Sequence, residues 1–305
     1  MARSASPVGF NPSQEMSRRT LELHYNLDLS SPHVDFHAHP FYELYFFLEG
    51  DLEGYVVGGH SYQLRPGDIL MMPPGVPHHP IFLPDAGPYR RYVLWLAAEQ
   101  LNIMEQIDPG LLEVFQRCQQ DQTYHIRCTS HTVREQLETC LNNMWQEELG
   151  ASPCKHACLC SLSLSFLVLL NRVIADEHAI PSPHYQSDTL LDKLIAYINE
   201  NYANPISLSA VAELFYTSPS NIEQLFSKKL GKPFYLYVTE CRIIHAQSLI
   251  SSGMPLKEVA HACGYNDYSN FYRAFTREVG ISPSKFRLML TPAHFQSVHI
   301  GKDNE

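Results

Sequence analysis

The sequence lacks a long uninterrupted apolar run and any surplus of basic residues. Its richest apolar stretch, residues 159–170, is interrupted by serines, so no segment reaches the roughly 18 apolar residues of a membrane-spanning helix. The first residues contain no apolar signal core, which predicts a cytoplasmic protein. Lys and Arg total 22 against 32 Asp and Glu. A net charge of −10 excludes a chain that binds nucleic acid through bulk positive charge.

Cysteine is present, but without the paired Cys-x2-Cys spacing of a dependable zinc site. Residues 154–160 place Cys154 and Cys158 one helical turn apart beside His156, which would permit a soft metal or an oxidant-sensing thiol pair. Because this stretch leads directly into an apolar helix, we interpret its cysteines as core or interface residues.

The acidic charge is confined to the first part of the chain. Residues 1–187 hold 11 basic and 21 acidic side chains, whereas residues 188–290 hold ten and nine. A length of 305 residues allows two domains, each with its own core. The second part can bind DNA only if its basic side chains gather on one face.

Residues 206–287 contain one pattern twice. Val211 recurs as Val259 at an offset of 48, and Phe226 recurs as Phe275 at an offset of 49. The extra residue lies in the second turn, so the helices on either side keep their register. Each copy predicts a short helix, a tight turn and a second helix.

The second helix of each copy begins at a clear capping signal. Ser218 is followed by Pro219, and Asp267 occupies the corresponding position of the second copy. Residues 234–250 predict one long helix between the copies. Two helix-turn-helix units on a stiff connector could enter successive segments of the DNA major groove.

The C-terminal residues resemble the DNA-binding domain of AraC/XylS-type bacterial transcription regulators. The resemblance covers residues 190–287. It rests on Ser218-Pro-Ser, Arg242 with Ala246, Gly264-Tyr265, Asn270-Phe271 with Arg273 and Phe275, and Gly280-Ile-Ser-Pro-Ser-Lys-Phe-Arg287. This ordered combination is far more specific than a single helix-turn-helix pattern. It implies double-stranded promoter DNA and RNA polymerase as partners, with activation commoner than repression.

The resemblance also places the family's base-reading face on named residues. These are Ser220, Glu223 and Gln224 in the first unit, and Tyr268, Ser269 and Arg273 in the second. Phosphate contacts are expected from Lys228, Lys229, Arg277 and Lys285. Arg273 is the best candidate for bidentate recognition of guanine. The first unit departs from the family pattern, since Asn221 replaces a common aromatic residue and Gln224 a common basic one.

Before residue 100 the hydrophobic period changes to two. Strands are predicted at 21–27, 34–39, 42–48, 54–57, 61–64, 69–72 and 91–96, separated by Gly- and Pro-containing turns. This pattern is typical of a small β-barrel or double sheet. Helical periodicity returns over 101–175, and 181–187 reads as a Pro/Ser-rich hinge. We expect a multidomain α+β protein, with a barrel in 18–100, a helical dimerisation or linker region in 101–180 and the DNA-binding domain in 188–290.

One spacing in the barrel region carries possible chemistry. His37, His39 and Glu43 occupy odd positions and share a strand face if Pro40 keeps the register. His78 follows a Pro/Gly turn further along. Three nitrogen ligands and one oxygen ligand that converge inside a barrel could bind iron, manganese, nickel or zinc.

These two stretches resemble the two sequence motifs of the cupin superfamily, over about residues 30–96. In metal-binding cupins the four matching residues are ligands. AraC-type regulators commonly use such a barrel to bind a small effector without a metal, so we expect no cofactor. The expected effector pocket is lined by Phe36, His37, His39, Glu43, Tyr45, His78 and Trp95. The resemblance implies a sugar or related metabolite as the effector.

The sequence therefore predicts a cytoplasmic transcription regulator, controlled by a small molecule, with no enzymatic activity and no membrane partner. Helices within 137–173 are expected to form a homodimer surface, or alternatively to pack only on the barrel. One rival is a metal-dependent cupin oxygenase or isomerase with a DNA-binding appendage. Another is a structural DNA-bridging protein whose barrel binds nothing.

Overall fold

The computed structural model describes residues 16–18, 20–29, 34, 37–175, 179–180, 185–186 and 189–290. Phe36 and most of the predicted hinge, including residues 181–184, lie outside these residues.

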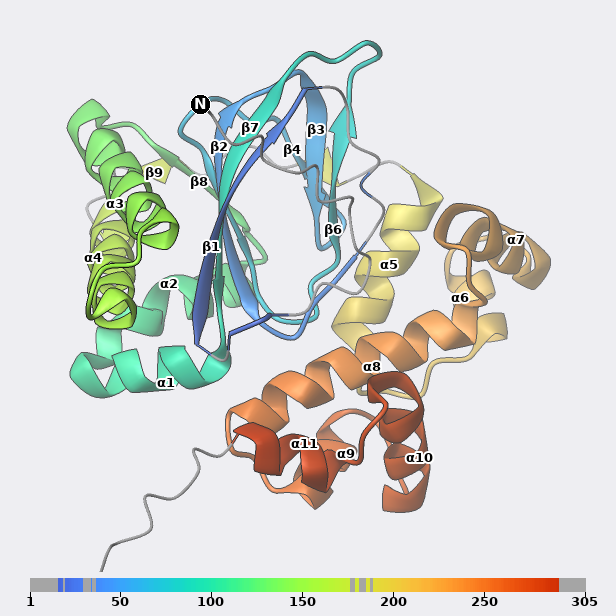
Figure 1. Cartoon of the computed structure of the whole chain (residues 1–305). Coiled ribbons are helices and arrows are strands. Elements are labelled where there is room, and N and C mark those ends of the chain that lie inside the picture. Colours follow the sequence, from blue (N-terminus) through green and yellow to red (C-terminus); the bar gives the residue numbers. More distant parts are fainter. Residues whose placement is uncertain are drawn as a thin grey trace, which may run out of the picture.

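Two antiparallel sheets face each other and form the barrel of the N-terminal part (Figure 1). The larger sheet holds, in spatial order, β1 (Leu21–Asp28), β7 (Tyr89–Leu96), β2 (Tyr42–Glu49), β5 (Ile69–Met72), β8 (His125–Cys128) and β9 (Ala179–Ile180). The smaller holds β10 (Tyr185–Gln186), β4 (His60–Tyr62), β3 (Leu52–Val57) and β6 (His78–Phe82). The predicted double sheet is confirmed.

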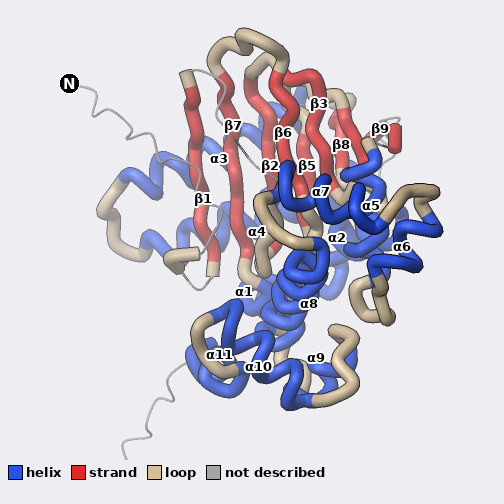
Figure 2. The backbone as a smooth tube through the Cα atoms, turned by 90° about the vertical axis from the view of Figure 1, so that its right-hand side faces the viewer, coloured by secondary structure: helices blue, strands red, loops and turns tan. Residues whose placement is uncertain are grey.

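Helices cover the barrel and build the C-terminal part. Beside the barrel lie α1 (Ala98–Ile107), the short 3-10 helix η1 (Pro109–Leu112), α2 (Glu113–Asp121), α3 (His131–Leu149) and α4 (Lys155–Ala175). The C-terminal part holds α5 (Leu190–Asn201), α6 (Leu208–Leu214), α7 (Pro219–Leu230), α8 (Phe234–Ser251), α9 (Leu256–Ala262), α10 (Tyr268–Val279) and α11 (Pro283–Leu290). The α3–α4 pair lies on the opposite side of the barrel from α5, and α8 runs beneath the barrel with a helix-turn-helix unit at each end (Figures 1 and 2).

Strand β2 separates the barrel interior from the helix-covered face. Glu43 and Tyr45 point between the sheets, where Tyr45 meets the ring of Tyr55 on β3 at 5.0 Å between centroids. Tyr42 points the other way and contacts Phe115 of α2. The period-2 alternation that predicted a strand here therefore sorts polar, site-forming residues to the inside.

Four strands lie outside the predicted ones: β6, β8 and the two-residue strands β9 and β10. Strand β6 contains Pro80, which cannot donate to a sheet ladder, but β6 lies at the edge of the smaller sheet, next to β3. Strand β8 falls within the region predicted to be helical, yet its Ile126 pairs with Ile69 of β5. A strand of four residues is too short to interrupt a helical pattern visibly in the sequence.

The strand predicted at 34–39 is wrong for the described residues of that stretch. His37 forms only an isolated bridge with His78, and the chain bends at Pro40 and Phe41 before β2 begins. Proline disfavours the conformations that would carry a regular ladder through this point.

The duplicated pattern forms two helix-turn-helix units as predicted. Ser218 Oγ accepts a hydrogen bond from the Asn221 N–H at the start of α7, and Asp267 Oδ1 accepts one from Ser269 at the start of α10. The matched apolar positions Phe226 and Phe275 are fully buried in two separate cores. The connector α8 contributes to both cores, which fixes one unit relative to the other.

Candidate functional site

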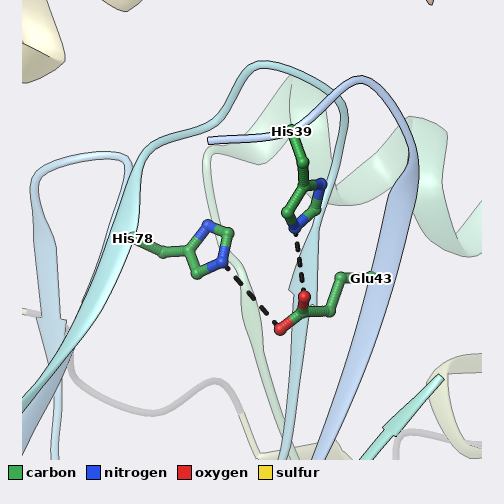
Figure 3. Close-up of side chains that lie close together, drawn as sticks. All are labelled: His39, Glu43 and His78. Carbon is green, nitrogen blue, oxygen red and sulfur yellow. Dashed lines mark hydrogen bonds and ion pairs between the residues drawn. The ribbon is translucent and has the colours of Figure 1, made fainter. Parts of the chain in front are cut away.

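Three side chains with metal-binding atoms converge inside the barrel (Figure 3). His39 Nε2 lies 3.1 Å from Glu43 Oε2, and His78 Nε2 lies 3.9 Å from Glu43 Oε1. All three side chains are buried, and their ligand atoms lie within 4.8 Å of one another. We call His39, Glu43 and His78 the barrel cluster; within the described part of the chain, no other three His, Cys, Asp or Glu side chains gather so closely.

The bend before β2 creates this convergence. His39 precedes the bend and Glu43 follows it on β2, so the two residues do not share a strand face as the sequence pattern suggested. The ring of Phe41 stacks on His39 at 4.0 Å between centroids and 3° between planes, which holds the imidazole over Glu43. The residues are those predicted, but a bend rather than strand alternation brings them together.

Backbone carbonyls fix the proton positions on both imidazoles. His39 Nδ1 lies 2.9 Å from the Phe41 carbonyl, and His78 Nδ1 lies 2.9 Å from the Val76 carbonyl. A carbonyl only accepts, so each Nδ1 carries a proton. A neutral His78 ring then presents a lone pair at Nε2, whereas His39 Nε2 donates a hydrogen bond to Glu43 Oε2. Both Nε2 atoms point toward the carboxylate of Glu43.

The electrostatics of the cluster favour an ionised carboxylate beside a neutral His78. Burial raises the pKa of Glu43, but the hydrogen bond from His39 and the proximity of the neighbouring imidazoles outweigh it and lower that pKa to about 2. Burial, followed by the proximity of His37, holds the pKa of His78 well below its usual value. Trp95 Nε1 also donates to Glu43 Oε2 at 2.8 Å.

This donor set fits a divalent cation. Histidines that bind metals usually donate their second ring N–H to a carbonyl or carboxylate, as His39 and His78 do here. His78 Nε2 is buried without a hydrogen-bond partner. A bound ion would be held by His39, Glu43 and His78, and it would supply a Lewis acid inside the barrel.

Tyrosines line the barrel next to the cluster. The Tyr45 hydroxyl lies 2.6 Å from that of Tyr89, and the ring of Tyr55 lies 6.4 Å from that of His78. Burial raises the pKa of Tyr89 to about 12, so its hydroxyl is neutral and can donate a hydrogen bond. Sequence reasoning missed Tyr55 and Tyr89, the latter because the predicted strand began two residues too late.

The other expected pocket residues lie at different distances from the cluster. Trp95 faces Glu43 directly, since the two are paired across β7 and β2. The His37 ring lies 4.2 Å from that of His78 but 6.3 Å from that of His39, at the edge of the group. The role of Trp95 and His37 in holding an effector stays a prediction.

The expected DNA-reading face is partly exposed and partly engaged within the protein. Ser220, Gln224, Ser269 and Arg273 are exposed on α7 and α10. The expected phosphate contacts are exposed as well: Lys228 and Lys229 on α7, Arg277 on α10 and Lys285 on α11. Glu223 instead accepts a hydrogen bond from the Phe234 N–H, which caps the N-terminus of α8. The half-buried ring of Tyr268 packs against Phe271.

The cysteines at the start of α4 do not assemble into a site. Cys160 Sγ lies 3.6 Å from His156 Nε2, but no third ligand-bearing residue joins them among the described residues. Cys154 is exposed at the turn before the helix, while Cys158 and Cys160 are half-buried.

Known proteins resemble both parts of the chain. Residues 211–289 match a family described as a helix-turn-helix domain, and residues 27–93 match one described as a cupin domain. The uncharacterized HTH-type transcriptional regulator YijO of Escherichia coli K12 is 37% identical over 103 residues, which cover 33% of this chain and 36% of that protein. The HTH-type transcriptional activator RhaR of Salmonella schwarzengrund is 34% identical over 106 residues, covering 34% and 38%.

A third relative aligns with both parts of the chain. The uncharacterized HTH-type transcriptional regulator YfiF of Bacillus subtilis 168 is 26% identical over 287 residues, which cover 92% of this chain and 84% of that protein. By contrast, the chain matches little more than a third of the length of YijO and RhaR.

Proposed function

We propose that this chain, in which a cupin domain is joined to an AraC-type helix-turn-helix domain, is a sequence-specific transcription regulator controlled by a small molecule bound in the barrel. The observation that carries the proposal is the pair of helices α7 and α10, whose polar faces are exposed while their apolar faces are fixed through one connector, α8. Two rigidly linked recognition helices suit adjacent major-groove segments of promoter DNA.

Fluorescence anisotropy with the DNA upstream of the protein's own and neighbouring genes tests this function. We expect specific binding that exceeds binding to a scrambled duplex by about 10³ or more, with affinity that falls steeply as salt rises. Equal affinity for both duplexes at every salt concentration would contradict sequence-specific regulation.

For the effector, we propose a sugar or a related hydroxylated metabolite. Buried acceptors and donors of the barrel cluster stand beside the hydroxyls of Tyr45 and Tyr89, an arrangement that suits several hydroxyl groups on one ligand. The same anisotropy signal can screen a panel of sugars and sugar acids. A ligand that saturates the protein without changing its DNA affinity or transcription would rule out the proposed control.

We propose activation as the mode of regulation, with RNA polymerase as a partner. The relative RhaR, similar over 106 residues, is named a transcriptional activator. Transcription from the bound promoter with purified RNA polymerase should rise when the protein and its effector are added. A fall in transcript would assign repression instead.

A second copy of the chain is the proposed partner for the outer face of α3 and α4. A groove there has half-buried apolar walls and one charge of each sign at its rim; it is lined by Cys140, Leu164, Val168, Leu169, Glu135 and Arg172 among others. Opposite charges on one face suit self-pairing about a two-fold axis, in which each Glu135 meets the other copy's arginine.

Sedimentation of Val168→Glu tests this dimer. We expect the variant to sediment as a monomer, because a buried carboxylate would disrupt the interface, whereas Leu149→Glu, at an exposed position outside the groove, should remain dimeric.

Within the described residues, α4 alone is long and apolar enough to cross a membrane, and a third of its 18-residue apolar window is buried. We propose a cytoplasmic location, where the DNA partner lies.

A second candidate function is a metal-dependent cupin enzyme, and one observation favours it. Both Nε2 atoms of the barrel cluster face an ionised carboxylate while each Nδ1 donates to a backbone carbonyl, which is the orientation usual for histidines that bind a divalent ion. Metal analysis of the purified protein tests it. Close to one equivalent of metal together with turnover of a small substrate would support the enzyme; metal without turnover would leave the ion as part of an effector site.

A further inference from the structure

The turn between β5 and β6 is hydrogen-bonded to both histidines of the barrel cluster. The Gly75 N–H donates to the His39 carbonyl at 3.0 Å. The Val76 carbonyl accepts from His78 Nδ1 at 2.9 Å, and His78 itself follows the turn as the first residue of β6. A displacement of the His39 backbone or of the His78 ring would therefore move the turn or break one of its bonds.

The other side of this turn packs against the DNA-binding part. A Cβ at Gly75 would lie 2.5 Å from both Cε1 and Nε2 of His245 on α8, so the contact leaves no room for a methyl group. The His245 ring is held in place, because it stacks on Tyr202 at 3.9 Å between centroids and 4° between planes, and its Nε2 lies 3.3 Å from Asn199 Oδ1. The contact is closely packed on both sides.

A neighbouring turn makes a similar contact. A Cβ at Gly59 would lie 2.5 Å from that of Ala196 on α5. The two turns are joined, since the Gly58 N–H donates to the Pro77 carbonyl at 2.8 Å. The end of the barrel that carries the cluster is therefore also the surface on which α5 and α8 dock.

Helix α8 is the element through which a displacement would reach both DNA-binding units. Its residues Val238 and Cys241 belong to the core of the first unit, while Ile243 and Ala246 belong to the core of the second. His245 lies at this boundary between the cores. A change at His245 can therefore alter how both recognition helices are presented.

We propose that the contact between Gly75 and His245 is a docking latch that transmits the state of the barrel cluster to α8. The latch rests on the proposed function, because it gives the barrel site a route to the DNA-binding units. A molecule or ion that enters between His39 and His78 re-aims the two rings and shifts the turn. Closely packed surfaces switch between discrete arrangements, so the docked and released states differ in DNA affinity.

The first test compares full-length Gly75→Ala with the unaltered protein. We expect its affinity for promoter DNA to change about fivefold or more, and the backbone amides of α8 around His245 to exchange hydrogen faster. Gly253→Ala is the matched control, since Gly253 also has a positive φ (92° against 81°) but has open space where a Cβ would lie. His245→Ala removes the ring without crowding the turn, and it gives the same readout should Gly75→Ala fold poorly.

The second test asks whether the cluster and the latch are coupled. Glu43→Gln perturbs the cluster, and it should speed amide exchange in α8 in the unaltered background but not in His245→Ala. Unchanged exchange in α8 upon Glu43→Gln, with altered exchange at the cluster, would overturn the latch and leave the regulator intact. Failure of the unaltered protein to prefer promoter DNA would instead overturn the regulator, while the exchange experiment would still decide the latch.

Discussion

At the scale of single residues, Asp68 shows how the barrel accommodates a buried charge. Its carboxylate accepts two hydrogen bonds from Arg127, at 3.0 and 2.6 Å, and lies 2.9 Å from His125 Nε2. Burial raises the pKa of Asp68, but the hydrogen bonds from His125 and Arg127 outweigh that effect and lower it. The ionised carboxylate thus ties β8 to the turn before β5.

Removal of this charge should destabilise the protein strongly. We expect Asp68→Asn to lower the free energy of unfolding by about 3–5 kcal/mol, because Arg127 loses the carboxylate that pairs it. Urea unfolding measures the difference. Glu49→Gln, which breaks the exposed pair with Arg90, should cost about 1 kcal/mol or less. Similar losses in both variants would mean that the buried pair is no stronger than a surface one.

Arg273 is the residue on which base recognition can be tested most directly. It is exposed on α10, where its Nη2 donates to Asn270 Oδ1 at 2.6 Å and so is held along the helix. We expect Arg273→Ala to weaken binding to the cognate site by about 1–3 kcal/mol and to relax specificity at one base pair. Lys285→Ala should instead weaken cognate and scrambled DNA equally. An equal loss on both duplexes for Arg273→Ala would reassign it to phosphate contact.

The sequence identifies which residues carry the chemistry better than it explains how they meet. His39, Glu43 and His78 stand out by type and spacing, and the structure brings them together. The bend at Pro40 that aligns them is a local break that strand alternation does not show, and the capping role of Glu223 at α8 depends on a tertiary contact. Such contacts leave no periodic signal in the chain.

At the scale of elements, the two helix-turn-helix turns place different residue types at the same positive-φ position. Both need a residue with positive φ after the first helix: Gly264 at 77° in the second unit and Tyr216 at 51° in the first. The next residue donates to the equivalent carbonyl in each unit, Thr217 to Ala212 and Tyr265 to Ala260. The backbone of Tyr216 is strained in this conformation, whereas glycine adopts it without strain.

Substitutions at the two turns should therefore have opposite effects. We expect Tyr216→Gly to stabilise the protein by up to about 1 kcal/mol, as relief of strain exceeds the added entropy of the unfolded chain. Gly264→Ala should destabilise it, because a Cβ there would lie 2.7 Å from the Ala203 carbonyl oxygen. Thermal unfolding distinguishes these outcomes, and a Tyr216→Gly variant that melts lower would show that the exposed ring contributes more than its strain.

Element length decides what the sequence can predict. The long helices α3, α4 and α8 and the strands β1 and β2 repeat their pattern often enough to be recognised. The short strands β6 and β8 do not, and each is stabilised by pairing with a distant segment rather than by its own residues.

At the scale of the whole molecule, the interface between the two parts contains a histidine that should respond to acid. Burial lowers the pKa of His245 to about 4, below the ordinary value of 6.5. The folded protein therefore binds this proton less readily than the unfolded chain. The contribution of neutral His245 to the free energy of unfolding is complete above about pH 6.5 and is lost as the pH falls from there toward 4.

Unfolding measured across this pH range should show the effect. We expect His245 to contribute a slope of up to about 1.4 kcal/mol per pH unit between pH 6.5 and 4. His245→Gln keeps a polar side chain at the Asn199 contact but does not titrate, so its unfolding free energy should fall less steeply with acid. Identical slopes in the two proteins would mean that the interface opens before the ring is protonated.

The docking of the two parts could not be predicted from the sequence. The Pro/Gly turn before His78 is visible, and so is the helix that carries His245, but nothing in either stretch indicates that they touch. Their contact depends on the absence of a side chain at Gly75, which reads in the sequence only as a turn signal.

The short strand β10 sets how far the DNA-binding part can travel once released. Tyr185 and Gln186 pair with Ser61 and His60 of the barrel, and α5 is capped by Thr189 only three residues later. Three residues span at most about 11 Å even when fully extended. While that pairing holds, the start of α5 stays within about a nanometre of β10 even after the DNA-binding part is released. That part therefore remains at a high local concentration relative to the barrel surface on which α5 and α8 pack. Redocking is then a first-order event within one chain, and its rate does not depend on how many copies of the protein a cell contains.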